Sequence, residues 1–374
     1  MQTTKVKGSL IQIHTADLHF GAMDPRVQYE LLMERLVNRV RSIPFDAFFI
    51  NGDIFHHKFM ANSDVIMYAM MFINEVIKLC IEKEATLVLL HGTFSHDADQ
   101  LKLFYHHIGE PGLDLRIIEN MRFEDIKGYK FLCIPEEYGK GEMYYLDKMW
   151  FEQDYDMAVL HGAVKGAIYG CNERDLNNPK APVFDIGCFK RCRGPIICGH
   201  VHVPGCYQEH MYYCGSPLRW CFGEEQEKGF LVCAYSQDTG FYYVDFQSIE
   251  SFRYDTICLD DMLETDPKAV IAYIIEKQNT GVDYIKIKFG QSTATTDAVK
   301  KYFNTHANVV IEVSDIGFKK VVEENQSQND AFTKFKYLMG PNIDPYDIFC
   351  RYVNEATDGE FVITSDELVT LLLN

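Results

Sequence analysis

Short apolar runs alternate with longer amphipathic segments over the first 250 residues. Ala47–Ile50 and Thr86–Leu90 are short and apolar, as strands are, whereas Val27–Ile43 and Asp64–Lys83 repeat apolar residues at helical spacing. The other expected elements are the strands Ser9–Ile13, Leu115–Ile118, Tyr129–Ile134, Met157–Leu160, Pro195–Cys198 and Met211–Cys214, a short helix near Gln100–His107, and a hairpin joining Gly229–Tyr235 to Gly240–Phe246. Strands that alternate with helices and end in a run of strands predict a layered α/β domain, residues 1–250, with a partly antiparallel sheet.

The pattern changes at about residue 251. A strand–helix–strand–helix–strand order is expected there, over Tyr254–Leu259, Pro267–Gln278, Tyr284–Phe289, Thr296–His306 and Asn308–Val313. Residues 251–317 therefore predict a small α+β accessory domain, because they carry no cluster of candidate catalytic residues. Residues 318–342 predict a polar linker, and residues 343–374 predict two short amphipathic C-terminal helices.

The charge balance is strongly acidic, with 36 basic against 54 acidic residues and a net charge of −18. A protein that grips nucleic acid unaided needs clustered Lys and Arg, so this balance argues against a self-sufficient nucleic-acid binder. Lys190, Arg191 and Arg193 form the best local basic cluster, either for DNA-backbone contact or as an ordinary solvated turn. No signal peptide or membrane-spanning apolar run is recognisable, so we expect a soluble, cytoplasmic protein with no membrane contact.

The twelve cysteines lack the paired spacing of a compact zinc finger. Several fall on strand-like segments, where cysteine behaves as a small buried apolar residue. We therefore expect reduced thiols rather than structural zinc.

Five polar segments lie at or just past the ends of predicted strands. In chain order they contain Asp17 and His19, then Asp53, then Ser95 with His96 and Asp97, then His161, and finally His200 and His202. Loops after parallel strands converge on one edge of a sheet, where such residues can share ligands. Carboxylates and imidazoles suit manganese, iron or zinc, and two such ions can activate water and neutralise a phosphate ester.

Taken singly, most of these histidines have a structural alternative. His14, His56, His91 or His161 alone would more often be a hydrogen-bonded structural histidine than a ligand. The ordered set of five segments, rather than any one of them, predicts a two-metal phosphoesterase site.

These segments resemble the calcineurin-like metallophosphoesterases, whose pattern is Asp-x-His, Gly-Asp, Gly-Asn-His-(Asp/Glu), a lone His and Gly-His-x-His. Within that family, "GDIFHHKFMANSD", "HGTFSHD" and "YYCGSPLRWCFGEEQEKGF" resemble the SbcD-type DNA repair exonucleases. The resemblance covers roughly residues 9–250 and implies a layered αββα metallophosphoesterase sandwich, followed by a small α+β capping domain that contacts DNA.

The resemblance also implies a role for each matching residue. Asp17, His19 and His202 would hold a first metal, His161 and His200 a second, and Asp53 would bridge them. The catalytic residues would be His96 beside the phosphate, Asp97 orienting its ring, and His56 near the substrate. Two divalent ions are expected, Mn²⁺ first, with Mg²⁺, Fe²⁺ or Zn²⁺ as alternatives.

The third segment departs from the family pattern. Gly92 is followed by Thr-Phe-Ser before His96, so the Asn that would bind the second metal is missing and two residues are inserted. A register anchored on His96 and Asp97 puts Ser95 in the position of that ligand. A hydroxyl is a weaker ligand than an amide carbonyl, so the occupancy of the second site is open.

The resemblance implies a metal-dependent DNA nuclease, an exonuclease with single-strand endonuclease activity in DNA repair, recombination or replication. Its partners would be DNA and an SbcC-like ATPase of the SMC class, bound through residues 343–374, with a homodimer of this chain inside a heterotetramer. Two alternatives stay open, namely a two-metal phosphatase or phosphodiesterase on a non-DNA substrate, and a catalytically weakened scaffold subunit.

Overall fold

The computed structural model describes residues 8–148, 150–165, 183–208, 210–224, 226–258, 266–290, 292–306 and 308–313. The predicted linker at 318–342 and the predicted helices at 343–374 lie outside these residues. Two compact units are present. One contains residues up to Ile257 with Ala272–Lys286 and His306–Val310, and the other contains Cys258–Ile271 and Ile287–Thr305.

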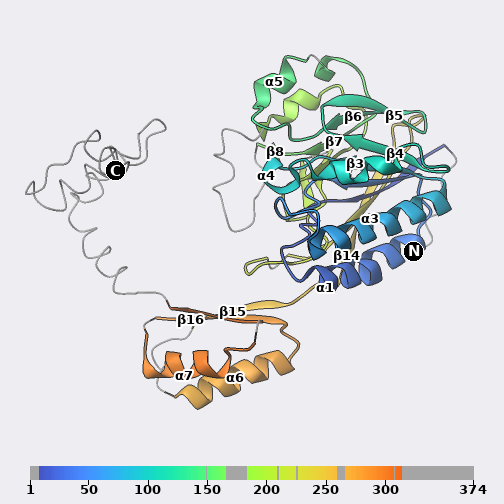
Figure 1. The fold of residues 1–374 in the computed structure, drawn as a ribbon. Coiled ribbons are helices and arrows are strands. Elements are labelled where there is room, and N and C mark those ends of the chain that lie inside the picture. The colour runs from blue at the N-terminus through green and yellow to red at the C-terminus, as the bar shows by residue number, and fades with distance from the viewer. Residues whose placement is uncertain are drawn as a thin grey trace, which may run out of the picture. The chain divides into compact units, whose positions relative to one another are not determined.

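Two six-stranded sheets form the centre of the first unit (Figure 1). The first sheet has the order β14 (Tyr242–Ile249), β13 (Lys228–Tyr235), β1 (Leu10–Thr15), β2 (Ala47–Asn51), β3 (Thr86–Leu90) and β4 (Asp114–Ile118). The second has the order β11 (Gly205–Gln208), β12 (Met211–Tyr213), β10 (Ile196–Gly199), β7 (Met157–His161), β6 (Tyr129–Ile134) and β5 (Arg122–Ile126). Strands β1 to β4 pair in parallel, as do β6, β7, β10 and β12, whereas β13, β14, β5 and β11 pair antiparallel with their neighbours.

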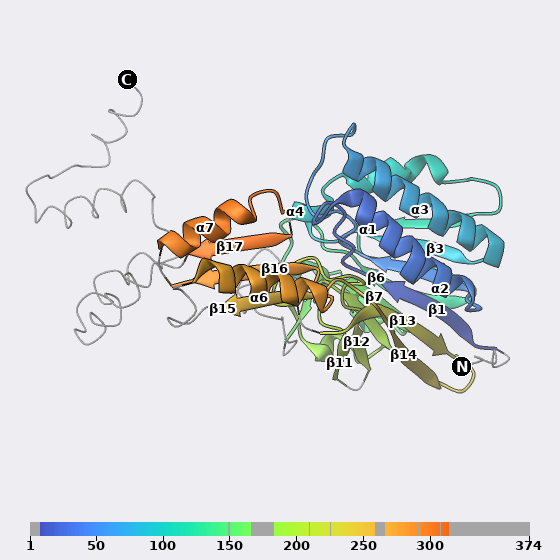
Figure 2. The same ribbon diagram turned by 90° about the horizontal axis from the view of Figure 1, so that it is seen from below.

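Helices cover the outer faces of the two sheets. On the first sheet these are α1 (Pro25–Leu31), which continues through a π-helical segment (Leu32–Val37) into α2 (Asn38–Arg41), and α3 (Asp64–Lys83). Ser63 caps α3 by accepting from the amide of Ile66, and Glu84 ends it in a left-handed conformation. Figures 1 and 2 show α1 and α3 side by side against the first sheet.

The remaining elements are short. They are α4 (Phe94–Asp97), α5 (Glu142–Leu146), the 3₁₀ helices Gln100–His107, Trp150–Glu152 and Ile186–Phe189, and the paired strands β8 (Ala163–Val164) and β9 (Val183–Phe184).

Alternate residues of the central strands enter different apolar cores, because successive side chains of a strand point to opposite faces. Phe48 and Ile50 of β2 pack in the core that contains α3, whereas Phe49 packs with Phe131 in the core between the sheets. A third core, which contains Leu132 together with α5, covers the outer face of the second sheet. The layers are thus helix, sheet, sheet, helix, and the predicted αββα sandwich is confirmed.

The region after residue 251 forms the strand–helix alternation that the sequence predicts. Its three-stranded sheet has the order β15 (Tyr254–Cys258), β16 (Tyr284–Phe289) and β17 (Val309–Val313), and the helices between the strands are α6 (Pro267–Asn279) and α7 (Ala294–Tyr302). Among the described residues, no helix is long and apolar enough to cross a membrane.

Candidate metal centre

Each of the five polar segments lies at or after the end of a strand that pairs in parallel with at least one neighbour. Asp17 follows β1, Asp53 follows β2, Thr93 follows β3, His161 is the last residue of β7, and His200 follows β10. Within the described residues, carboxylate and imidazole atoms gather into three groups whose ligand atoms lie within 4.8 Å of one another: Asp17, His19 and His202; Asp53, His161 and His200; and His19, His56 and His96. The structure therefore brings together the residues that the sequence selected from distant segments.

The first group is built around two facing imidazoles. His19 Nε2 lies 3.1 Å from His202 Nε2, and the carboxylate of Asp17 accepts from the amide of His200. His202 Nδ1 is 3.1 Å from the Glu224 carboxylate, which keeps the ring proton on Nδ1 and leaves a lone pair on Nε2. The lone pairs of the two Nε2 atoms and of the Asp17 carboxylate thus converge on one region. A cation bound there would interact with all three groups, whereas a shared proton would not.

The second group contains His161, which is similarly oriented. His161 Nδ1 donates to the carbonyl of Asn51 over 2.7 Å, so Nε2 faces Asp53 Oδ1 at 3.3 Å. The other oxygen of Asp53 lies 3.7 Å from His19 Nε2. One carboxylate therefore spans both groups, as a bridging ligand must.

The ligand-bearing turns use unusual backbone conformations. Asp17, His19, Asp53 and His200 all have positive φ, between 48° and 88°, which non-glycine residues adopt at a cost of roughly 1–3 kcal/mol and which clusters at functional sites. Gly52 leaves room for the ring of His161, which a Cβ at that position would overlap.

Burial and mutual charge shift the protonation of this cluster. Burial lowers the pKa of His200 to about 3, with the charge of His161 acting in the same direction. Burial also opposes protonation of His161, but Asp53 outweighs it and raises the pKa of His161 to about 10. Burial raises the pKa of Asp17 to about 6, against the pull of His202 and His161. A buried set of carboxylates and mostly neutral imidazoles is short of positive charge, which fits divalent cations.

His96 and His56 occupy the third group, beside the first. The side chain of His96 is 29% exposed, its Nε2 lies 4.0 Å from Asp53 Oδ2, and its Nδ1 hydrogen-bonds the carbonyl of His56. The half-exposed His56 ring lies 5.8 Å from that of His96 between centroids, and burial lowers its pKa. Both rings are thus placed to meet a substrate at the metal groups.

Asp97 has a different role from the one that we expected. Its carboxylate does not orient His96 but accepts from the backbone amides of Asp53, Phe55 and Gly92, at 2.8–3.1 Å. The carbonyl of His56 accepts from His96 Nδ1, so this carbonyl and not Asp97 orients the ring. Asp97 therefore fastens the turn after β2 to the turn after β3.

The structure also differs from the expected register of the third segment. Ser95 is exposed on the one-turn helix α4, whereas the hydroxyl of Thr93 lies 3.3 Å from His161 Nε2 and 3.5 Å from His200 Nδ1. The physical reason is that α4 accommodates the inserted residues after Thr93, so Thr93 stays next to Gly92 at the end of β3. Thr93 therefore stands where Ser95 was expected.

Besides Thr93, the sequence reasoning missed Glu224 and Trp220. Glu224 orients His202 and pairs with the buried Lys228 over 3.0 Å, and a signal for both was present in the Glu-x-x-x-Lys-Gly-Phe motif. Trp220 had no such signal, yet its ring centroid lies 5.0–5.2 Å from those of His19, His56 and His202. It encloses one side of the first group.

The basic cluster lies away from the metal groups. Arg191 and Arg193 bond with the backbone of Tyr155, just before β7 begins, whereas His161 ends that strand. Both arginines pair with Asp154, and Lys190 lies 4.0 Å from Glu152. The cluster therefore lies at the opposite end of β7 from the metal groups, and its contact with the DNA backbone stays a prediction.

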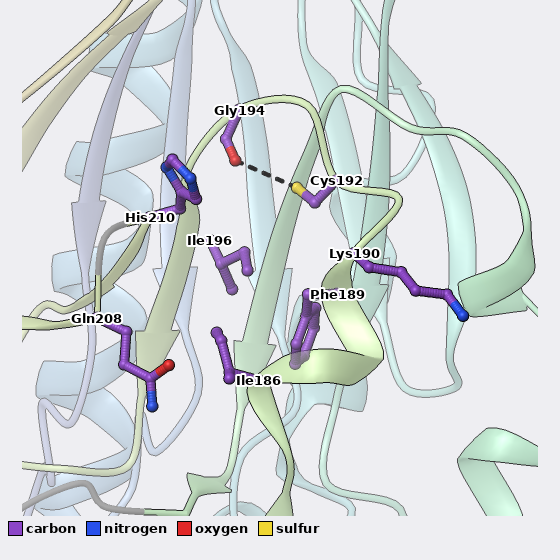
Figure 3. Close-up of a pocket in the computed structure, with 8 residues that line it drawn as sticks. All are labelled: Ile186, Phe189, Lys190, Cys192, Gly194, Ile196, Gln208 and His210. Carbon is purple, nitrogen blue, oxygen red and sulfur yellow. Dashed lines mark hydrogen bonds between the residues drawn. The ribbon is translucent and has the colours of Figure 1, made fainter.

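A cavity of about 520 Å³ lies at the start of β10, beside Lys190, Cys192 and His210 (Figure 3). It begins at Gly194 and Ile196, ahead of the strand's ligand end. The cavity is thus separate from the candidate metal centre.

The ten cysteines of the described residues are all free, in agreement with reduced thiols.

One comparison with known proteins identifies a family. The sequence pattern of the calcineurin-like phosphoesterases matches residues 13–204, just over half of the chain. No curated protein matches the chain. Of solved structures, 44 chains match, and one of them is 12% identical with a TM-score of 0.39, covering 64% of this chain and 100% of its own.

Proposed function

Because the chain belongs to the calcineurin-like phosphoesterase family, we propose that it is a metal-dependent DNA nuclease. The observation that carries the proposal is the Asp53 carboxylate, which lies between two groups of imidazole and carboxylate donors. A phosphodiester is the bond that such a centre hydrolyses in a nuclease, and the motifs that resemble SbcD-type exonucleases favour DNA as the substrate.

The residues fit two divalent ions, Mn²⁺ first. Asp17, His19 and His202 would hold one ion, His161 and His200 the other, and Asp53 both. The ions supply an activated water and neutralise charge on the phosphate when they are bound.

The protein's own acid is His96. Its Nδ1 is engaged by the carbonyl of His56, so Nε2 is the atom that can carry a proton toward the substrate. The partly exposed ring delivers that proton to the departing oxygen of the ester.

The proposal extends to partners by way of the sequence resemblance. The nuclease would be an exonuclease with single-strand endonuclease activity in DNA repair, recombination or replication. It would work as a homodimer within a heterotetramer, with an SbcC-like ATPase that supplies most of the DNA grip. The acidic charge of −18 is consistent with a subunit that depends on such a partner.

The second candidate is a phosphatase or phosphodiesterase on a non-DNA substrate. The placement of Lys190, Arg191 and Arg193 favours it, because this basic cluster lies at the opposite end of β7 from the metal groups.

The test compares substrates in Mn²⁺ with purified protein. End-labelled linear duplex DNA, circular single-stranded DNA, bis-p-nitrophenyl phosphate and p-nitrophenyl phosphate are each assayed, with Asp53→Asn as the matched inactive control. Cleavage of DNA and of the diester that disappears in Asp53→Asn supports the nuclease. Hydrolysis of the monoester alone would support the phosphatase, and no hydrolysis at all would support a scaffold.

A further inference from the structure

The second metal group lacks a fourth protein donor among the side chains assigned so far. Asp17, His19, His202 and the shared Asp53 make four around the first group, but Asp53, His161 and His200 make only three around the second. Such an ion takes four or more ligands, and waters or a further protein oxygen complete the set.

Thr93 supplies an oxygen at the right place. Its Oγ1 lies 3.3 Å from His161 Nε2 and 3.5 Å from His200 Nδ1, and its amide donates to Asp53 Oδ1 over 2.6 Å. Donor atoms that each lie about 2.1 Å from one ion are roughly 3.0–3.4 Å apart. The hydroxyl therefore stands at ligand spacing from His161 and within about 0.1 Å of that spacing from His200.

Glu136 is the second observation, and it is independent of the first. It follows β6, only 7% of its surface is exposed, and its Oε2 lies 3.3 Å from the Thr93 hydroxyl. Within the described residues, no lysine or arginine pairs with Glu136, whereas its neighbour Glu137 has Lys148 at 3.1 Å. A buried carboxylate that lacks such a partner is costly unless another cation is nearby, as His161 is here and as a metal ion bound by His161 would be.

We infer that Thr93 and Glu136 act together as the missing ligand of the second metal ion. The Thr93 hydroxyl donates its proton to Glu136 and offers a lone pair to the ion. By accepting that hydrogen bond, Glu136 makes the Thr93 oxygen a stronger metal ligand. Glu136 also contributes a negative charge, which the neutral threonine lacks. The inference rests on the proposed two-metal centre and does not depend on DNA being the substrate.

The experiment measures metal binding in Thr93→Val and Glu136→Gln, which preserve side-chain shape. Ser95→Ala is the matched control, because it removes an exposed hydroxyl two residues from Thr93. Bound manganese per chain is measured by elemental analysis after dialysis, and the stepwise Kd by titration calorimetry. Unfolding temperature in chelator verifies that each variant is folded.

We expect two manganese ions per chain in the wild type and in Ser95→Ala. In Thr93→Val and Glu136→Gln the weaker step should lose about 10–100-fold in affinity, while the unfolding temperature in chelator stays near that of the wild type. Thr93→Asn, with an amide oxygen at the same position, should retain both ions. Wild-type affinity for two ions in either Thr93→Val or Glu136→Gln would overturn the inference. Two-ion binding without DNA cleavage would instead refute the nuclease proposal and leave this one intact.

Discussion

Variants of the buried ion pair Glu224–Lys228 allow the effect of Glu224 on metal binding to be measured separately from its effect on folding stability. Lys228 is 1% exposed and donates to Glu224 over 3.0 Å, to the hydroxyl of Ser216 over 2.7 Å and to the carbonyl of His202 over 3.2 Å. Replacing Glu224 by Met leaves this ammonium buried with neutral acceptors alone. Breaking a buried pair from one side costs about 3–5 kcal/mol of unfolding free energy, a large share of the total for a typical protein.

The double variant Glu224→Met/Lys228→Met should recover roughly half of that loss. An apolar pair of similar volume is often as stable as the ion pair it replaces, less about 1–3 kcal/mol for the acceptors that Lys228 leaves unpaired. His202 does not recover, because its Nδ1 has lost the carboxylate that held the proton there. Affinity for the first metal ion should therefore stay roughly 10–100-fold below that of the wild type in both variants.

Urea unfolding in chelator measures the first quantity, and manganese titration calorimetry measures the second. The two should separate, with stability lost in the single variant and regained in the double, and metal affinity lost in both. If the double variant regained metal affinity together with stability, Glu224 would be a structural residue that does not orient His202.

Three further predictions concern catalysis, acid stability and partner binding. Asp53→Asn should abolish turnover and reduce bound manganese, whereas His96→Ala should lower turnover about 10²–10⁴-fold with manganese content unchanged, as measured by diester hydrolysis and elemental analysis. Burial would raise the pKa of Glu224, but its hydrogen bond with His202 and the charge of Lys228 lower it to about 2 from 4.5. Because the pKa is depressed in the folded state, the contribution of Glu224 to stability is present above pH 4.5 and is lost as the pH falls toward 2. The unfolding free energy in chelator should therefore fall more steeply over that pH range in the wild type than in the double Met variant. Truncation after Gly340 should abolish co-purification with an SbcC-like ATPase and spare basal activity in Mn²⁺, and a truncated chain that still co-purifies would contradict the assignment of residues 343–374.

The metal ligands could be predicted from the sequence because each has a local signal. A strand end is visible in the apolar pattern, and parallel strands bring their ends together, so Asp17, Asp53 and His161 could be placed at one edge before any contact was known. Glu136 lacks such a signal, and the motif that contains Glu224 does not indicate which residue Glu224 contacts. Each acts through a residue more than twenty positions away in the chain, and the pairing depends on how loops cross the sheet edge.

The position of the two inserted residues could not be predicted from the sequence. Two residues added between Gly92 and His96 can displace either end of the segment, and the sequence favours neither. The structure resolves the choice by coiling the insertion into α4, where the amides of His96 and Asp97 both bond the carbonyl of Thr93. One helical turn brings His96 back to Asp53 while Thr93 stays beside His161. The added residues therefore keep the acid and the metal-facing hydroxyl at the same centre, and what changes is the chemistry of one ligand, not the architecture that presents it.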